Sequence, residues 1–200
     1  MARRPASSNT VRLIAGELGG RKVRFPHARG LRPTADRTRE TLFNWLLNDI
    51  EDSYCLDLFA GSGALGLEAV SRGAAHVTMV DSSAQVVRQL QENARLLNVD
   101  NRMSIVSQKA ASFLSHYQPQ YQPHYQKQPF DIVFLDPPFA DNQLQQVVDL
   151  LFADNCLADR AKIYLERDFR QEMPLLPENC MVLRDKKAGQ VAFSLLEYCR

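Results

Sequence analysis

The residues best suited to chemistry in this chain are four neighbours, Asp136, Pro137, Pro138 and Phe139. They follow an apolar, β-branched run, 131–135, that predicts a buried strand. Because proline cannot donate to a sheet ladder, the two prolines lie beyond that strand. The segment presents a carboxylate, two fixed carbonyls and an aromatic ring at the carboxyl end of a strand, where open α/β sheets bind ligands. The alternative is that Asp136 only caps a turn.

A second candidate group is a glycine-rich turn, in which Gly61, Gly63 and Gly66 form the pattern G-x-G-x-x-G between a predicted strand and a predicted helix. Glycine permits the tight turn and lets a ligand touch the backbone. Asp81 ends the next strand about twenty residues after Gly61, where a carboxylate can bind two ribose hydroxyls. These residues indicate an adenosine-type cofactor, NAD or S-adenosylmethionine. Asp57 favours the second, because a carboxylate there would repel a pyrophosphate but suit an ammonium and a sulfonium.

Alternating strand and helix patterns begin at residue 53 and position these groups. Strands are predicted at 54–59, 76–80, 103–106, 131–135, 161–166, 180–184 and 190–198, and helices at 64–72, 83–97, 110–114 and 142–152. Repeated β-α units favour an α/β fold with a mostly parallel sheet covered on both faces. Only residues 185–189 separate the last two strands, which is a hairpin spacing, so we expect an antiparallel strand at that end.

The first 40 residues form a basic arm on a mildly acidic body. They contain ten Lys or Arg and three Asp or Glu, a net charge of +7, whereas residues 41–200 carry −6. Two runs that alternate apolar and basic residues, 11–16 and 21–25, predict a β-hairpin with one apolar and one basic face. A basic face suits a nucleic-acid phosphate backbone. The candidate RNA contacts are Arg12, Arg21, Lys22, Arg24 and Arg39.

We expect three parts in the chain: a disordered tail over 1–9, a basic β-hairpin and loop over 10–33, and a cofactor-binding catalytic domain over 34–200. A helix is predicted over 39–48, with Thr34 as a candidate N-cap. Residues 115–129 are polar, rich in proline and short of aliphatic side chains, which predicts a mobile surface loop inserted in the domain. Its tyrosines could stack on bases, but a tolerated loop expansion is the simpler interpretation.

Composition excludes several other classes of protein. The hydrophobic and charged fractions, 45% and 24%, are ordinary for a globular domain. No apolar run approaches the ~20 residues of a membrane span, and none follows the basic N-terminus as in a secretory signal. The four cysteines lack the spacing of metal ligands. We therefore expect reduced thiols in a cytoplasmic protein.

The ordered set of motifs resembles a known enzyme family. Residues 136–139 are similar to the (D/N/S)-P-P-(F/Y/W) motif of methyltransferases that act on exocyclic amines of bases, and residues 57–66 resemble their S-adenosylmethionine loop. The segment RPTADRTRETLFNWL at 32–46, the glycine-glycine hairpin before it and the turn KAGQ at 187–190 resemble the RsmD family. That family methylates N2 of guanine 966 in bacterial 16S ribosomal RNA. The resemblance covers about residues 11–198.

This resemblance implies a class I methyltransferase (Rossmann-like) fold, with a seven-stranded sheet, an antiparallel last strand and the hairpin as an RNA-binding appendage. It also implies residues that hold S-adenosylmethionine: Thr34, Arg37, Asp57, Gly61, Ser62, Gly63 and Asp81. Many class I enzymes have an Asp after the third strand that accepts from the adenine amine. This chain has Gln108 there, so Gln108 or the backbone must make that contact.

By the same resemblance, Asp136 and the Pro137 carbonyl accept the N–H groups of the target amine, and Phe139 stacks on an extruded base. No metal is required. The expected partner is 16S ribosomal RNA, within the small subunit or its assembly intermediate, and the expected state is a monomer without a membrane. The alternatives are an adenine-N6 methyltransferase acting on DNA or RNA, a non-catalytic RNA-binding assembly factor and a nicotinamide dehydrogenase. The dehydrogenase would need a hydride-transfer site that the sequence does not offer.

Overall fold

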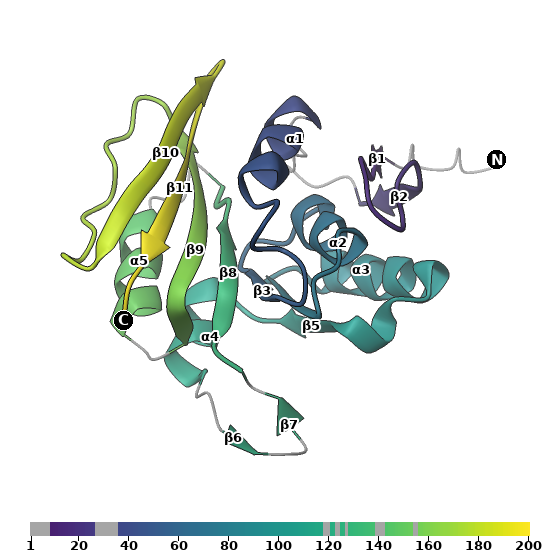
Figure 1. The fold of residues 1–200 in the computed structure, drawn as a ribbon. Coiled ribbons are helices and arrows are strands. Elements are labelled where there is room, and N and C mark those ends of the chain that lie inside the picture. Colours follow the sequence, from purple (N-terminus) through teal and green to yellow (C-terminus); the bar gives the residue numbers. More distant parts are fainter. Residues whose placement is uncertain are drawn as a thin grey trace, which may run out of the picture.

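The computed structural model describes residues 9–26, 36–117, 121–122, 125–126, 128–138, 143–153 and 156–200 (Figure 1). The strands are β1 (Asn9–Arg12), β2 (Lys22–Phe25), β3 (Tyr54–Asp57), β4 (His76–Asp81), β5 (Met103–Ser107), β6 (Tyr121–Gln122), β7 (Tyr125–Gln126), β8 (Phe130–Leu135), β9 (Leu157–Asp168), β10 (Cys180–Ala188) and β11 (Val191–Tyr198). The helices are α1 (Asp36–Trp45), α2 (Ala64–Ser71), α3 (Ala84–Leu97), α4 (Ala110–His116) and α5 (Leu144–Ala153), with a 3-10 turn at Asp100–Arg102. None of the helices described combines the length and apolar character needed to cross a bilayer.

Seven strands form one sheet in the order β10-β11-β9-β8-β3-β4-β5. The central strand, β3, pairs in parallel with β4 and β8, and the parallel pairing continues to β5 on one side and β9 on the other. The last strand, β11, is antiparallel to both of its neighbours, β9 and β10. Gly189 makes the tight turn between β10 and β11 with a φ of 62°. This topology confirms the predicted α/β class and the antiparallel last strand.

Alternate side chains of each strand enter two separate apolar layers, one on each face of the sheet. Cys55 and Phe134 pack beneath α1, α2 and α3, whereas Leu56 and Leu135 pack against α4 and α5. Figure 1 shows the helices α1, α2 and α3 on one side of the sheet and α4 and α5 on the other. Each of these apolar side chains is fully buried, which stabilises the fold by roughly 1.5–3 kcal/mol per large side chain. The face covered by α1 to α3 is also the one that the N-terminal hairpin joins.

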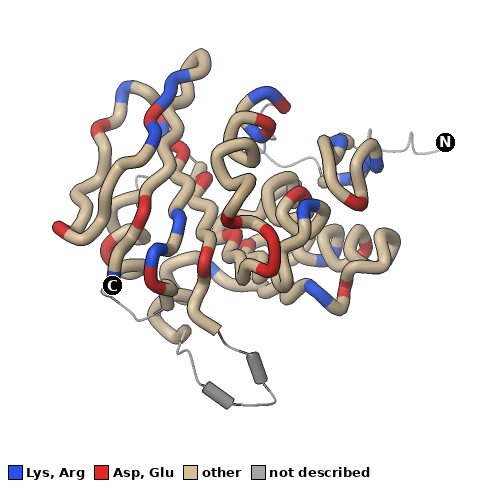
Figure 2. The backbone as a smooth tube through the Cα atoms, viewed as in Figure 1, with Lys and Arg blue, Asp and Glu red and all other residues tan. Residues whose placement is uncertain are grey.

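The predicted N-terminal hairpin is present as the antiparallel pair β1–β2, with Arg12 opposite Lys22 and Val11 opposite Val23. Val11 and Val23 are buried, and Arg12, Lys22 and Arg24 are exposed, so one face is apolar and the other basic as expected. Figure 2 shows the basic residues gathered along these two strands. The hairpin is not independent of the sheet, because its Arg24 carbonyl accepts a hydrogen bond from Asn93 of α3 at 2.8 Å.

Buried polar groups fasten the hairpin turn to α1 and α2. The Glu68 carboxylate accepts from the backbone N–H groups of Ile14 and Ala15 at 2.8 and 3.0 Å, and pairs with Arg72 and Arg39. Gly16 must be glycine, because a Cβ there would lie 1.8 Å from the Ser71 carbonyl oxygen.

Arg39 belongs to this buried network and not to the surface. Its side chain is 0% exposed, lies 2.6 Å from Asp36 and donates to the Arg12 carbonyl at 2.9 Å. The prediction that Arg39 contacts RNA is therefore wrong. Arg39 lies on the inner face of α1. Its ion pair with the buried Glu68 offsets part of the cost of burying its charge.

Several element boundaries also differ from those predicted. The helix α1 begins three residues earlier than expected, at Asp36, whose acidic side chain suits the first helical turn. The strand β9 begins at Leu157, which pairs with Phe130 of β8, and β10 continues to Ala188, which pairs with Val191 of β11. The segment predicted as a loop from residue 115 is helical to His116, and Tyr117 is buried with its hydroxyl donating to the Gln128 carbonyl. Residues 121–122 and 125–126 pair as the short strands β6 and β7.

Candidate active site

The candidate site is the edge of the sheet where the parallel strands β3, β4, β5 and β8 end. Asp57 and Asp81 are the last residues of β3 and β4, and Asp136 directly follows β8. Backbone hydrogen bonds hold the chain ends together beyond the strands, from Leu58 to the Phe134 carbonyl at 3.2 Å and from Ala60 to the Val80 carbonyl at 3.0 Å. Three acidic groups, separated by up to 79 positions in the sequence, therefore converge at one edge.

The glycine-rich turn lies between β3 and α2, as the motif predicts. Gly61 and Gly63 have φ values of 49° and 77°, which side-chain-bearing residues rarely adopt. Gly66 lies where α2 crosses β4, and a Cβ there would be 2.9 Å from the Met79 methyl carbon. Ser62 is buried and its hydroxyl accepts from the Ala64 N–H at 3.3 Å. The turn brings backbone close to the site and presses α2 onto the sheet.

Asp57 is buried beneath this turn and is held by backbone donors. It is 1% exposed, and its carboxylate accepts from the Gly66 N–H at 3.1 Å. Burial raises the pKa of Asp57 from 3.8 to about 7; the Gly66 hydrogen bond opposes this shift, and the charges of Asp136 and Asp81 add to it. The three carboxylates therefore interact electrostatically, and together they favour a cationic ligand.

Asp81 is fixed in orientation by the same loop. One carboxylate oxygen accepts from the Gly61 N–H at 3.0 Å and the other from the Ser83 N–H at 2.8 Å. Each oxygen retains a further lone pair for a hydroxyl of a ligand. Gln108 lies next to it, because its backbone N–H donates to the Asp81 carbonyl at 3.1 Å, and its side chain is exposed. Neighbouring positions for ribose and adenine recognition are thus available.

The other predicted site residues lie in several different parts of the chain. Asp136 is half-buried and Pro137 is buried, so both border the carboxyl edge. Arg37 is exposed in the first turn of α1. Thr34 and Phe139 lie outside the described residues, and their roles stay predictions. Arg21 is exposed just before β2, beside the basic face formed by Arg12, Lys22 and Arg24.

Sequence reasoning missed one acidic residue at this edge, Glu166 near the end of β9. Glu166 is 4% exposed, and its carboxylate accepts from the Tyr164 hydroxyl at 2.6 Å. A charged residue that closes an apolar strand was a usable signal, since the strand pattern 161–166 ends on it. Only the pairing of β9 beside β8 shows that Glu166 belongs to this edge of the sheet.

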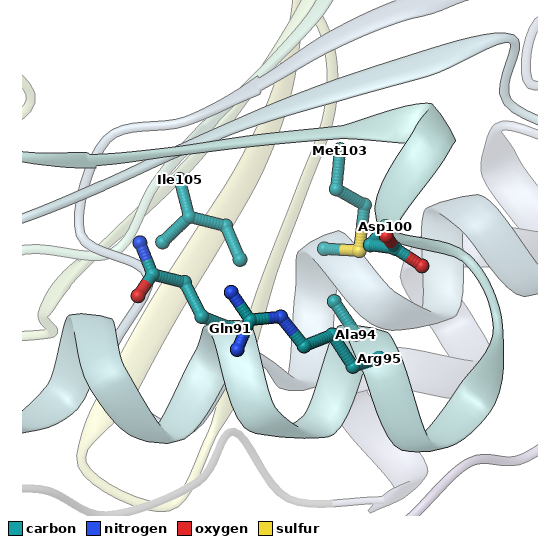
Figure 3. A pocket seen from close by; sticks show the side chains of 6 residues that line it. All are labelled: Gln91, Ala94, Arg95, Asp100, Met103 and Ile105. Atoms are coloured by element: carbon teal, nitrogen blue, oxygen red, sulfur yellow. The ribbon is translucent and has the colours of Figure 1, made fainter.

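A surface pocket of about 180 Å³ lies elsewhere, between α3 and the edge strand β5 (Figure 3). It is lined by Gln91, Ala94, Arg95, Asp100, Met103 and Ile105. None of these residues belongs to the carboxyl edge, and Met103 is the first residue of β5. This pocket is therefore separate from the candidate site.

Comparisons with known proteins match nearly the whole chain. A family model described as "Conserved hypothetical protein 95" matches residues 11–197. The chain is 44% identical to the ribosomal RNA small subunit methyltransferase D of Escherichia coli over 96% of this chain and 92% of that protein. It is also 44% identical to the protein of the same name from Haemophilus influenzae, over 96% of each. A solved structure described as "Putative methyltransferase yhhF from Escherichia coli" superposes with a TM-score of 0.85 at 43% identity, covering 96% of this chain and 99% of that one.

Proposed function

Since the chain belongs to the Conserved hypothetical protein 95 family together with the ribosomal RNA small subunit methyltransferases D, we propose that it is a ribosomal RNA methyltransferase. Its target is the exocyclic N2 amine of one guanine in 16S ribosomal RNA, guanine 966. The methyl donor is S-adenosylmethionine, and the substrate is the small subunit or its assembly intermediate. The observation that carries the proposal is the position of Asp136 and Pro137, at the same edge as the glycine-rich turn and within electrostatic range of Asp57.

The residues at this edge fit S-adenosylmethionine, which supplies an electrophilic methyl group on a sulfonium when bound. The cofactor carries a sulfonium and an ammonium, and the three carboxylates here repel one another without a cation. Gly61, Ser62 and Gly63 would hold the methionine part, and Asp81 the ribose. Thr34 and Arg37 are proposed to bind the methionine carboxylate, and Gln108 to lie at the adenine.

Asp136 and the Pro137 carbonyl orient the target amine. The guanine amine is a weak nucleophile because its lone pair is delocalised into the ring. Two acceptors for its N–H groups hold the nitrogen in one orientation and favour positive charge developing on it. Asp136 is also placed to receive the proton that the nitrogen then loses. Phe139 is proposed to stack on the extruded base.

The basic face of the hairpin is proposed to bind RNA phosphates. Arg12, Lys22 and Arg24 lie on one exposed face, with Arg21 beside them. Phosphate contacts of this kind position a substrate without reading its sequence, and their strength falls with salt. The hairpin would thus deliver RNA to an edge that is itself acidic.

The test is a transfer assay with methyl-labelled S-adenosylmethionine on naked 16S ribosomal RNA and on partly assembled small subunits, followed by nucleoside mapping of the product. We expect N2-methylguanosine at a single position, with more product on assembled particles than on naked RNA if subunit proteins help to position the substrate. Label on adenine N6 would instead support the alternative function, since the Asp-Pro-Pro motif suits either amine. Absence of transfer to either RNA substrate would contradict the proposal.

A further inference from the structure

Glu166 lies beside Asp136 on the neighbouring strand. The strands β8 and β9 pair in parallel as far as Leu135 and Leu165, so Asp136 and Glu166 are the next residue of each. On its other side Glu166 is paired with Phe193 of β11. A second carboxylate therefore lies next to the one proposed to hold the target amine.

The face of the sheet on which Glu166 lies is set by Tyr164, two residues earlier. Tyr164 is fully buried in the apolar layer beneath α1, together with Phe134 and Phe193. This is the face on which the glycine-rich turn and α2 pack. Burial raises the pKa of Tyr164, and the charges of Glu166 and Asp136 raise it further, so both carboxylates lie near its hydroxyl.

The Tyr164 side chain holds the Glu166 carboxylate in place. The Tyr164 hydroxyl donates to it at 2.6 Å, and the Tyr164 ring packs 6.3 Å from Phe193, which itself stacks on Trp45 at 5.4 Å. A buried carboxylate with fixed geometry is suited to selective hydrogen bonding, because a wrong partner cannot be accommodated by side-chain movement. A carboxylate has about four acceptor sites, so it can accept from more than one donor at once.

We propose that Glu166 is the residue that selects guanine, by accepting the N1–H of the base while Asp136 and the Pro137 carbonyl accept from its N2 amine. This inference rests on the proposed function. Guanine presents two neighbouring donors, N1–H and the N2 amine, to a pair of acidic groups. Adenine presents an N1 acceptor beside its N6 amine, so its N1 lone pair would face a buried carboxylate.

The preference for guanine follows from whether the base at the site offers a hydrogen-bond donor to the Glu166 carboxylate. With guanine, Glu166 gains a charge-assisted hydrogen bond. With a base that has an acceptor at N1, the carboxylate gains nothing and meets a second lone pair in a buried site. A well-placed hydrogen-bonding group of this kind discriminates between bases by about 10- to 100-fold.

The test compares guanine with 2-aminopurine at the target position in reconstituted small subunits. 2-Aminopurine keeps the amine at position 2 but has an acceptor at N1. We expect wild-type protein to favour guanine in kcat/KM, and we expect Glu166→Gln to reduce that preference by about 10- to 100-fold. The glutamine amide can donate to the N1 of 2-aminopurine and can still accept from Tyr164, so the fold should be retained. The loss of O6 in 2-aminopurine is common to both proteins and cancels in the comparison.

A matched control is Glu197→Gln. Glu197 is also buried on the sheet, at 7% exposed, but it pairs with Lys162 near the opposite edge. This variant should leave the base preference unchanged even if it lowers stability. A second measurement follows the fluorescence of 2-aminopurine, whose affinity for Glu166→Gln should exceed that for the wild type.

The outcomes separate this proposal from the function on which it rests. If wild-type protein forms N2-methylguanosine and Glu166→Gln keeps the full guanine preference, the role of Glu166 is overturned and the proposed function stands. If wild-type protein methylates adenine and not guanine, both are overturned. If Glu166→Gln loses the preference for guanine and Glu197→Gln keeps it, the proposal is supported.

Discussion

The carboxyl edge of the sheet holds acidic side chains in buried or half-buried positions, whereas the hairpin β1–β2 presents basic side chains to solvent. Asp57 is 1% exposed and is fixed by a backbone N–H, while Lys22 and Arg24 alternate outward along a short strand. Burial makes the ionisation of each acidic group depend strongly on its partners. Each exposed basic group stays hydrated and mobile, and its interactions are screened by salt. The first arrangement suits a single small ligand held in one geometry. The second suits a long polyanion bound at many points.

The two regions are joined by a third kind of charge, the buried pair of Arg39 and Glu68. Glu68 lies on α2, which starts at the glycine-rich turn, and it accepts from the hairpin backbone at Ile14 and Ala15. Arg39 links the Arg12 carbonyl of the hairpin to α1. These hydrogen bonds connect the hairpin to α1 and to α2, the helix that follows the glycine-rich turn.

The largest effect is expected at the acidic edge, from Asp136→Ala. Because the target amine loses an acceptor and a proton acceptor together, kcat should fall by about 10²- to 10⁴-fold. Binding of S-adenosylmethionine, measured by calorimetry, should survive and weaken far less than kcat falls, because Asp57 and Asp81 remain. The matched control is Asp131→Ala, near the start of the strand that Asp136 follows, whose carboxylate accepts from the Tyr54 N–H at the opposite edge. A fully active Asp136→Ala protein would remove the mechanism.

Next in size is the junction between the two regions. Arg39→Met should lower the free energy of unfolding by about 3–5 kcal/mol, because it breaks a buried ion pair of Glu68. Urea denaturation measures this loss, and amide exchange at Ile14 and Ala15 should become faster. Glu40→Ala, an exposed change on the same helix, should stay within about 0.5 kcal/mol of wild type. If Arg39→Met also changed the free energy of unfolding by no more than about 0.5 kcal/mol, the hairpin would be held by its apolar face alone.

The basic face should affect RNA binding alone. Replacing Arg12, Lys22 and Arg24 by Ala should weaken binding to 16S ribosomal RNA and reduce the slope of log K against log salt by about 2–3. The affinity for S-adenosylmethionine should not change. Arg200→Ala, an exposed arginine at the C-terminus, provides the comparison. An unchanged salt slope in the triple variant would remove the role given to the hairpin.

The smallest effect concerns proton uptake at Asp57. Its folded pKa of about 7 exceeds the unfolded value of 3.8, so the free folded protein binds more protons than the unfolded chain between about pH 4 and 7, and its stability falls as pH rises through that window. A cationic cofactor favours the ionised carboxylate. Affinity for S-adenosylmethionine should therefore rise with pH up to about 7, by at most tenfold per unit, and calorimetry of Asp57→Asn should show a flatter profile. An equally steep profile in Asp57→Asn would assign the dependence to another group.

Much of the fold was accessible from sequence because local patterns matched global structure. The alternation of β-branched runs with helical patterns predicted each strand of the parallel part, and the helix predicted over 83–97 is present as α3. The glycine turn and Asp81 were also locatable, because their spacing reflects one β-α-β unit.

What could not be predicted depended on contacts between distant segments. Arg39 looked like one more basic residue until its partner Glu68, from another helix, placed it in the interior. Glu166 became a candidate only when β9 was paired beside β8, which makes it the residue that follows Leu165 next to the one that follows Leu135, Asp136. Sequence distance hides such pairs, because strand order in a doubly wound sheet differs from chain order.

The most direct test of the central claim is a crystal structure with S-adenosylhomocysteine and an RNA fragment that contains the target guanine. We predict that the N2 amine lies at about 2.7–3.2 Å from both the Asp136 carboxylate and the Pro137 carbonyl, with the cofactor sulfur on the side of the glycine-rich turn. A guanine bound by another edge, or an amine held away from Asp136, would contradict the account.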